Sequence, residues 1–283
     1  PVDRRQRQMC IRDSPRTIKT VYLVSSQKFS NDNQLLIVFS DISKLKTLEK
    51  MREDFIGNVS HELRTPISVI KANSETLLST KLIKDENAIN FTKAIQSQSE
   101  RMATIVNELL SISSMESGDY PISLDKLNIK NIVDSAIKEL NPMTESSNIK
   151  LVNKISDITH IIGDESAIKI IISNYITNAI KHSPDDEIIE IDNEKIDKDF
   201  CRIKVIDNGI GIAKKYRERV FERFFRVDKG RSKKIGGTGL GLSISKNLAL
   251  MMGYSVGVES NEPKGSIFYI DVKIHQETSK EVA

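Results

Sequence analysis

The pattern of apolar and polar positions begins with two short strand-like segments. IKTVYLVSS and QLLIVFS, between Pro15 and Ser43, are rich in β-branched residues, and Asn31, Asp32 and Asn33 lie between them. Such a pattern predicts a β-hairpin. Two strands do not form a stable domain by themselves. We therefore expect the hairpin either to pack on a later part of the chain or to be the end of a domain whose front half is missing.

Two seven-residue repeats of apolar positions follow the hairpin. The first contains Ile56, Leu63, Ile70 and Leu77, with Val59 and Ile67 on the adjacent face. The second alternates steps of four and three residues through Phe91, Ile95, Gln98, Met102, Ile105, Leu109 and Ile112. Repeats of this kind predict paired helices. An antiparallel helical hairpin leaves one apolar side bare, so the sequence predicts a homodimeric four-helix bundle.

Gly118 and Pro121 interrupt the helical pattern and indicate a domain boundary. Beyond them, helical patterns at 128–140, 165–182 and 240–251 mix with the strand-like segments IIEID, CRIKVID, YSVGVES and SIFYIDVKI. The predicted fold is multidomain: an all-α helical hairpin, then an α+β two-layer sandwich with helices on one face of a sheet.

Composition excludes several classes of protein. The chain has 283 residues, 39% of them hydrophobic, and a net charge of +3. The arginine-rich tract 1–14 carries much of that charge and resembles a cloning artefact, with a disordered basic tail as the alternative. The remainder is nearly neutral, so we expect no nucleic-acid partner. Two isolated cysteines fit a reducing cytoplasm. Apolar runs fall far short of the roughly 20 residues that cross a membrane.

Candidate chemistry begins with two polar motifs in the second half. NYITNAIKHS places Asn174, Asn178 and Lys181 along one helix. An amide oxygen suits a magnesium ion whose charge is offset mainly by a triphosphate, and Lys181 could meet a phosphate. DNGIGI joins Asp207, an acceptor for an adenine amino group, to glycines that admit a flat base. Each motif alone is common on unliganded surfaces.

A third motif, IGGTGLGLSIS, places glycines at the opening of a helix. Exposed backbone amides there form an anion site suited to phosphates. The segment FERFFRVDKGRSKKIGG precedes it and predicts a mobile basic lid, from which Arg226 could reach the terminal phosphate. The competing interpretation of Lys229 to Lys234 is a solvated lysine run.

The order of these motifs resembles the N, G1, F and G2 boxes of the Bergerat ATP-binding fold. With VSHELRTP upstream, the chain resembles the bacterial two-component sensor histidine kinases from about Asp41 to Ile274. Gly265 and Phe268 match the closing Gly-x-x-Phe of that fold. The resemblance implies ATP and Mg²⁺ as cofactors, with Asn178 holding the metal. The implied ATP-binding residues are Asn174, Asn178, Lys181, His182, Asp207, Gly209, Gly211, Arg226, Gly237, Thr238, Gly239, Leu240, Gly241 and Leu242.

The resemblance also gives roles to the histidine motif. His61 is then the nucleophile, because an imidazole with a pKa of about 6.5 is largely neutral at pH 7. Glu62 orients the ring or accepts its proton. Thr65, four residues on, could hold a water for dephosphorylation of a partner. Pro66 lacks the amide that would bond the carbonyl of Glu62, so we expect a bend near His61.

The expected domains are the following: 1–14 artefact or tail, 15–43 the end of a PAS-like sensor domain, 44–117 dimerisation and phosphotransfer, 118–123 linker, 124–276 ATP-binding and 277–283 disordered. Expected partners are a second copy and a response regulator receiver domain, with no membrane contact within this chain. Full-length relatives are often membrane-anchored upstream. Two rivals stay open: a chaperone- or topoisomerase-type ATPase that uses water as nucleophile, and a non-enzymatic adaptor with a vestigial ATP domain.

Overall fold

The structure is a computed structural model that describes residues 20–28, 35–79, 86–145, 147–156, 160–227 and 237–275. The chain divides into two compact units, Pro1–Thr65 and Pro66–Ala283, which are considered separately below. No helix in the described ranges is both long enough and apolar enough to cross a membrane. The tracts 1–14 and 277–283 lie outside the described residues.

The first unit contains the predicted β-hairpin. Strands β1 (Tyr22–Lys28) and β2 (Leu35–Asp41) pair antiparallel, with Tyr22 opposite Asp41. Helix α1 (Ser43–Ser79) starts at once, and Asp41 Oδ1 accepts a hydrogen bond from the Ser43 amide at 2.9 Å. The apolar side chains of the hairpin are exposed, Phe39 by 63%. The hairpin is confirmed, and its assignment to a PAS-like domain stays a prediction.

Helix α1 continues through Pro66, so the proline does not end the helix. Helix α2 (Glu86–Ser117) is the second predicted helix. The C-terminal half of its apolar seam packs on the α+β part: Ile112 and Met115 belong to that core, and Leu109 lies against it. The sequence did not predict this contact. These side chains gain free energy by leaving water for the apolar α+β core.

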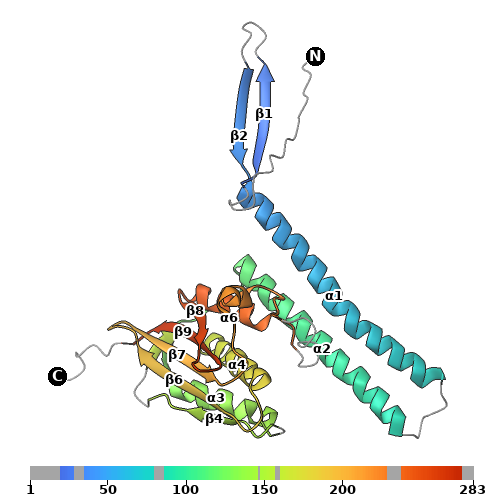
Figure 1. Cartoon of the computed structure of the whole chain (residues 1–283), viewed down its shortest axis with the longest axis vertical. Helices are drawn as coiled ribbons and strands as arrows, with labels where there is room; N and C mark the ends of the chain where they lie inside the picture. The colour runs from blue at the N-terminus through green and yellow to red at the C-terminus, as the bar shows by residue number, and fades with distance from the viewer. Residues whose placement is uncertain are drawn as a thin grey trace. The chain divides into compact units, whose positions relative to one another are not determined.

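The α+β part is a five-stranded sheet with helices on one face, and it lies in the second unit (Figure 1). The strand order is β4-β6-β7-β9-β8; β4 and β6 are parallel, and the other neighbours are antiparallel. The strand bounds are β4 Lys150–Asn153, β6 Ile188–Lys195, β7 Phe200–Asp207, β8 Ser255–Ser260 and β9 Ser266–Lys273. A separate antiparallel pair is formed by β3 (Asp125–Asn128) and β5 (His160–Gly163).

Three helices cover this sheet: α3 (Ile129–Leu140), α4 (Glu165–His182) and α6 (Gly241–Met251). Short 3-10 turns occur at Asn141–Met143, Lys214–Tyr216 and Arg219–Phe221. Alternate residues of β7 and β9 are buried, and α4 buries one face that includes Ile172 and Tyr175. The predicted helices and the predicted two-layer fold are therefore confirmed.

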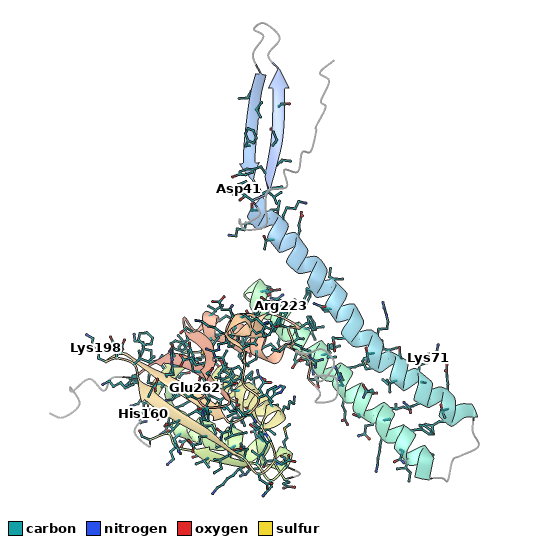
Figure 2. The ribbon with its side chains drawn as sticks, viewed as in Figure 1. Asp41, Lys71, His160, Lys198, Arg223 and Glu262 are labelled. Carbon is teal, nitrogen blue, oxygen red and sulfur yellow. The ribbon has the colours of Figure 1, made fainter. Side chains whose placement is uncertain are left out.

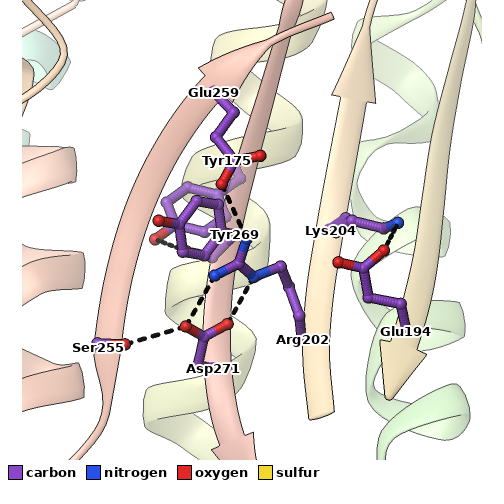
Figure 3. A network of polar contacts seen from close by, with 8 residues as sticks. All are labelled: Tyr175, Glu194, Arg202, Lys204, Ser255, Glu259, Tyr269 and Asp271. Atoms are coloured by element: carbon purple, nitrogen blue, oxygen red, sulfur yellow. Dashed lines mark hydrogen bonds and ion pairs between the residues drawn. The ribbon is translucent and has the colours of Figure 1, made fainter. Parts of the chain in front are cut away.

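The other face of the sheet carries charged side chains. Arg202 on β7 bonds Asp271 on β9, and its guanidinium lies 3.5 Å from the Tyr269 ring centroid (Figure 3). Arg202 also bonds Glu259 on β8 at 2.9 Å. These contacts tie three neighbouring strands together across the polar side. Figure 2 shows how the side chains are distributed along the described chain.

Candidate functional site

Helix α4 supplies the asparagine face. Asp164 caps its start by accepting a hydrogen bond from the Ala167 amide at 2.8 Å, so the helix begins where the sequence predicts. Asn174 lies in the middle of α4, and its amide nitrogen donates to the carbonyl oxygen of Gly241 at 3.0 Å and to Ser245 Oγ at 3.1 Å. Asn174 therefore joins α4 to the first turn of α6. Its contact with a nucleotide stays a prediction.

Asp207 ends β7 and is 3% exposed. Its Oδ1 accepts two backbone hydrogen bonds, from the Gly209 amide at 2.8 Å and the Ser266 amide at 3.1 Å. Burial raises the pKa of Asp207, while these two bonds act in the opposite direction. Because Oδ1 is committed to the backbone, Oδ2 is the oxygen that would accept a hydrogen bond from a ligand.

Glycines surround Asp207 because the backbone is crowded there. A Cβ added at residue 209 would lie 2.5 Å from the carbonyl oxygen of His182, which brings the end of α4 against this turn. Gly211 has a φ of +71°. Gly265 has a φ of +125°, and a Cβ there would lie 1.9 Å from the carbonyl oxygen of Asp207. Only glycine fits at 209 and 265 without a rearrangement.

The glycine turn and the FERFFR segment lie together. The Phe224 amide donates to the carbonyl oxygen of Gly239 at 2.8 Å, and Arg226 Nη2 donates to the carbonyl oxygen of Gly237. Gly239 has a φ of +76°, and a Cβ there would lie 3.0 Å from Phe224 Cα. Gly236 and the basic run 229–234 lie outside the described residues.

At the start of α6 the Thr238 hydroxyl accepts a hydrogen bond from the Leu240 amide at 3.2 Å. Leu240 occupies the cap position with no side-chain hydrogen bond, and its own side chain is fully buried in the core. Leu242 also packs against the core. The side chains of these predicted residues therefore serve packing, and only their backbone is suited to an anion.

Lys181 lies at the glycine turn, its Nζ 4.0 Å from the position of a Cβ at residue 237. Burial lowers the pKa of Lys181; Glu108 opposes this shift, while Arg226 and Arg101 add to it. Glu108, on α2, was not predicted as part of the site. The only signal in the sequence was an acidic residue between the seam positions Ile105 and Leu109.

Asn261 was also missed. Its amide nitrogen donates to the carbonyl oxygen of Asp207 at 3.0 Å and to Asn208 Oδ1 at 3.1 Å, so it holds the DNG turn from the loop between β8 and β9. The predicted residues Asn178 and His182 lie on the last two turns of α4, with Asn178 half-buried and His182 exposed.

The motif around His61 lies on α1, close to the end of the first unit at Thr65. Residue 61 is helical, but the side chain of His61 lies outside the described residues. Glu62 is half-buried and Thr65 is exposed on the same helix. The roles predicted for these three residues stay predictions.

Two family models match the chain. Residues 51–118 match "His Kinase A (phospho-acceptor) domain" and residues 163–276 match "Histidine kinase-, DNA gyrase B-, and HSP90-like ATPase". The first match contains the helical hairpin with residue 61, and the second contains α4, Asp207 and the glycine turn.

Several curated proteins are similar to this chain. The sensor-like histidine kinase SenX3 of Mycolicibacterium smegmatis is 34% identical over 86% of this chain and 63% of its own length. The sensor histidine kinase WalK of Bacillus subtilis is 33% identical over 94% of this chain and 44% of its own. The phosphate regulon sensor protein PhoR of Pseudomonas aeruginosa is 33% identical over 85% of this chain and 54% of its own. The chain thus spans about half to two thirds of these relatives.

Solved structures agree on the fold. Full-length ShkA in complex with AMPPNP has a TM-score of 0.59 and 25% identity, covering 80% of this chain and 47% of its own. The Acinetobacter baumannii histidine kinase AdeS has a TM-score of 0.63 and 22% identity, covering 76% of this chain and 98% of its own. The chain belongs to the sensor histidine kinase family, with a phospho-acceptor domain followed by a histidine kinase-type ATPase domain.

Proposed function

We propose that this chain is an ATP-dependent protein-histidine kinase that phosphorylates His61 and passes the phosphoryl group to an aspartate of a response regulator. The observation that carries the proposal is the convergence of Asp207, Lys181 and the glycine turn around the ends of α4 and the start of α6. This site belongs to a chain whose residues 51–118 match a phospho-acceptor domain.

The nucleotide would bind with its base at Asp207 and its phosphates at the glycine turn. Oδ2 of Asp207 accepts a hydrogen bond from the adenine amino group, beside the turn that Gly209 allows to pack against the end of α4. Lys181 and the amides that open α6 face the phosphates. ShkA, of similar fold, was solved with AMPPNP, an ATP analogue.

Magnesium fits this site only together with the nucleotide. Within the described ranges no group of three or more His, Cys, Asp or Glu side chains could hold a metal ion. The phosphates would therefore supply most of the negative charge, with the amide oxygen of Asn178 as the protein ligand. When bound, the ion offsets the charge on the phosphates.

The chemical step is a phosphoryl transfer. The unprotonated imidazole nitrogen of His61 forms a bond to the γ-phosphorus, the bond to the β,γ-bridging oxygen breaks, and ADP leaves with that electron pair. Glu62 accepts the hydrogen bond, or the proton, of the other ring nitrogen. In the second step the receiver aspartate takes the phosphoryl group and His61 is regenerated. Thr65 is suited to orient a water that hydrolyses the phosphorylated partner.

The partners follow from the family. A second copy would complete a four-helix bundle with α1 and α2, and a response regulator would be the acceptor. The histidine kinase ThkA, of similar fold with a TM-score of 0.63 and 20% identity, was solved with the response regulator protein TrrA. The hairpin β1-β2 as the end of a PAS-like sensor, and a membrane anchor upstream in the full-length protein, belong to the same proposal.

The test is incubation of the purified chain with γ-labelled ATP. We expect a label on the protein that acid removes and base does not, and that is missing in His61→Gln. Label that persists in His61→Gln would contradict the assignment of the nucleophile. ATP turnover with no labelled protein would favour the rival in which water is the nucleophile, and neither labelling nor nucleotide binding would favour the adaptor.

A further inference from the structure

Helix α2 contacts the α+β part next to the groups assigned to phosphate. On α2, Ile105 and Ile112 are 0% and 1% exposed, and Ile112 belongs to the core of the α+β part. One turn beyond Ile112, Glu116 forms an ion pair with Arg223 of the FERFFR segment, and Figure 2 labels Arg223 beside α2. The helix is therefore held at this surface by both apolar and ionic contacts.

Glu108 lies within this contact and points a carboxylate at the site. Burial raises the pKa of Glu108, while a hydrogen bond from Thr238 and the charge of Lys181 act in the opposite direction. Its Oε2 is buried and has no hydrogen-bond partner among the described residues. Burying a carboxylate this way is costly unless cationic or hydroxyl groups face it. Lys181 and Thr238 are the groups that do so.

These same groups were assigned to the nucleotide. Thr238 belongs to the glycine turn, and its hydroxyl accepts a hydrogen bond from the Leu240 amide at 3.2 Å. Lys181 lies against Gly237 of the same turn. A cavity of about 290 Å³ adjoins the contact and is lined by Glu108 and Thr104 of α2, Asn174 of α4 and Ile244 of α6. A carboxylate and a phosphate oxygen make the same kinds of bond to an ammonium and a hydroxyl.

We propose that Glu108 takes the place of a nucleotide phosphate at Lys181 and Thr238, so that docking of α2 and binding of a nucleoside di- or triphosphate compete. This inference rests on the proposed function, because it takes Lys181 and Thr238 as phosphate-side groups. Competition is reciprocal: the nucleotide weakens the docking of α2 by the same factor as α2 weakens the nucleotide. Nucleotide binding would then release the ATP domain from α2.

The test measures nucleotide affinity by calorimetry in the full chain. Glu108→Gln keeps the shape and the acceptor oxygen but removes the charge. We expect it to bind AMPPNP with Mg²⁺ at least about fivefold more tightly than the wild type. Glu100→Gln removes the same charge from an exposed position two turns earlier on α2, where the Glu100 carboxylate accepts a hydrogen bond from Gln96 one turn away on the same helix. We expect less than a twofold change there.

A second ligand separates phosphate competition from a general opening of the site. Adenosine carries no phosphate, so its affinity should be equal in the wild type and Glu108→Gln. An unchanged or weaker AMPPNP affinity in Glu108→Gln, or an equal gain for adenosine, would overturn the inference while leaving the proposed kinase intact. Failure of every variant to bind AMPPNP would overturn both. Labelling of His61 reports on the kinase separately.

Discussion

Arg202 and Asp271 form a two-point ion pair across neighbouring strands, with Nε to Oδ1 at 2.7 Å and Nη2 to Oδ2 at 3.0 Å (Figure 3). The two side chains are 20% and 18% exposed, so solvent screens the pair only partly. The guanidinium also lies over the Tyr269 ring. The planar fork of arginine makes all of these contacts at once, which a lysine ammonium cannot do.

Arg202→Lys should therefore lower the free energy of unfolding by about 1 to 2 kcal/mol, because the charge is kept but the two-point geometry and the ring contact are lost. Urea unfolding measures the change. Lys71→Gln is the control: Lys71 faces Glu75 at 3.8 Å with both side chains largely exposed, and such pairs contribute less than about 0.5 kcal/mol. Equal effects of the two substitutions would refute the argument.

Gly265→Ala should disrupt the Asp207 turn. Its added Cβ would lie 1.9 Å from the carbonyl oxygen of Asp207, and the φ of +125° is strained for alanine. We expect a loss of roughly 3 kcal/mol in stability and at least tenfold in nucleotide affinity. Gly253→Ala is the matched control, since its φ is +76° and no atom lies within 4 Å of the added Cβ. It should cost about 1 kcal/mol and leave affinity unchanged.

The sequence predicted the parts of this fold that carry long periodic patterns. The bounds expected for α4 are those observed, and Asp164 explains its start. Strands β3, β4 and β5 were missed because each has only four residues, too few to show alternation. Their pairing depends on contacts distant in sequence, such as β4 with β6.

The sequence predicted the site as separate motifs, and the structure shows the contacts that join them. Asn174 could be placed on a helix face from spacing alone, but its bond to Gly241, 67 residues on, could not be read from the sequence. Leu240 stands inside a glycine motif, yet it is a core residue. Glu108 belongs to another domain's pattern, so no local signal connects it with Lys181.

Asp207→Asn should change which base the site accepts. Asn Oδ1 can keep the two bonds to the Gly209 and Ser266 amides, which then turns its NH₂ group toward the ligand. A donor would face the donating amino group of adenine, whereas the 6-oxo group of hypoxanthine is an acceptor. We expect ATP affinity to fall at least about tenfold and the preference for ATP over ITP to disappear or reverse. Competition binding measures both, and an undiminished preference for ATP would contradict the role of Asp207.

The same substitution predicts a pH dependence of stability. Because burial raises the pKa of Asp207 above its ordinary value of 3.8, the folded chain holds this proton more tightly than the unfolded chain does. The contribution of Asp207 is then most favourable below 3.8 and declines as the pH rises through the raised pKa. Asparagine does not titrate. The Tm of Asp207→Asn relative to wild type should therefore increase between pH 4 and pH 7, and a decrease would show that the backbone bonds outweigh burial.

The apolar residues that α2 leaves exposed predict where a second copy binds. Leu110 is 63% exposed and Val106, one turn earlier, is 42% exposed, while Ile105, Leu109 and Ile112 face the α+β core or are buried. Burying one leucine stabilises an interface by about 1.5 to 3 kcal/mol, and in a twofold-symmetric interface each substitution occurs twice. Leu110→Glu should therefore weaken the proposed dimer at least about tenfold in sedimentation equilibrium. Leu250→Glu, at a leucine of α6 that is 60% exposed, should not change it. A dimer that resists Leu110→Glu, or that responds equally to Leu250→Glu, would place the interface on another surface.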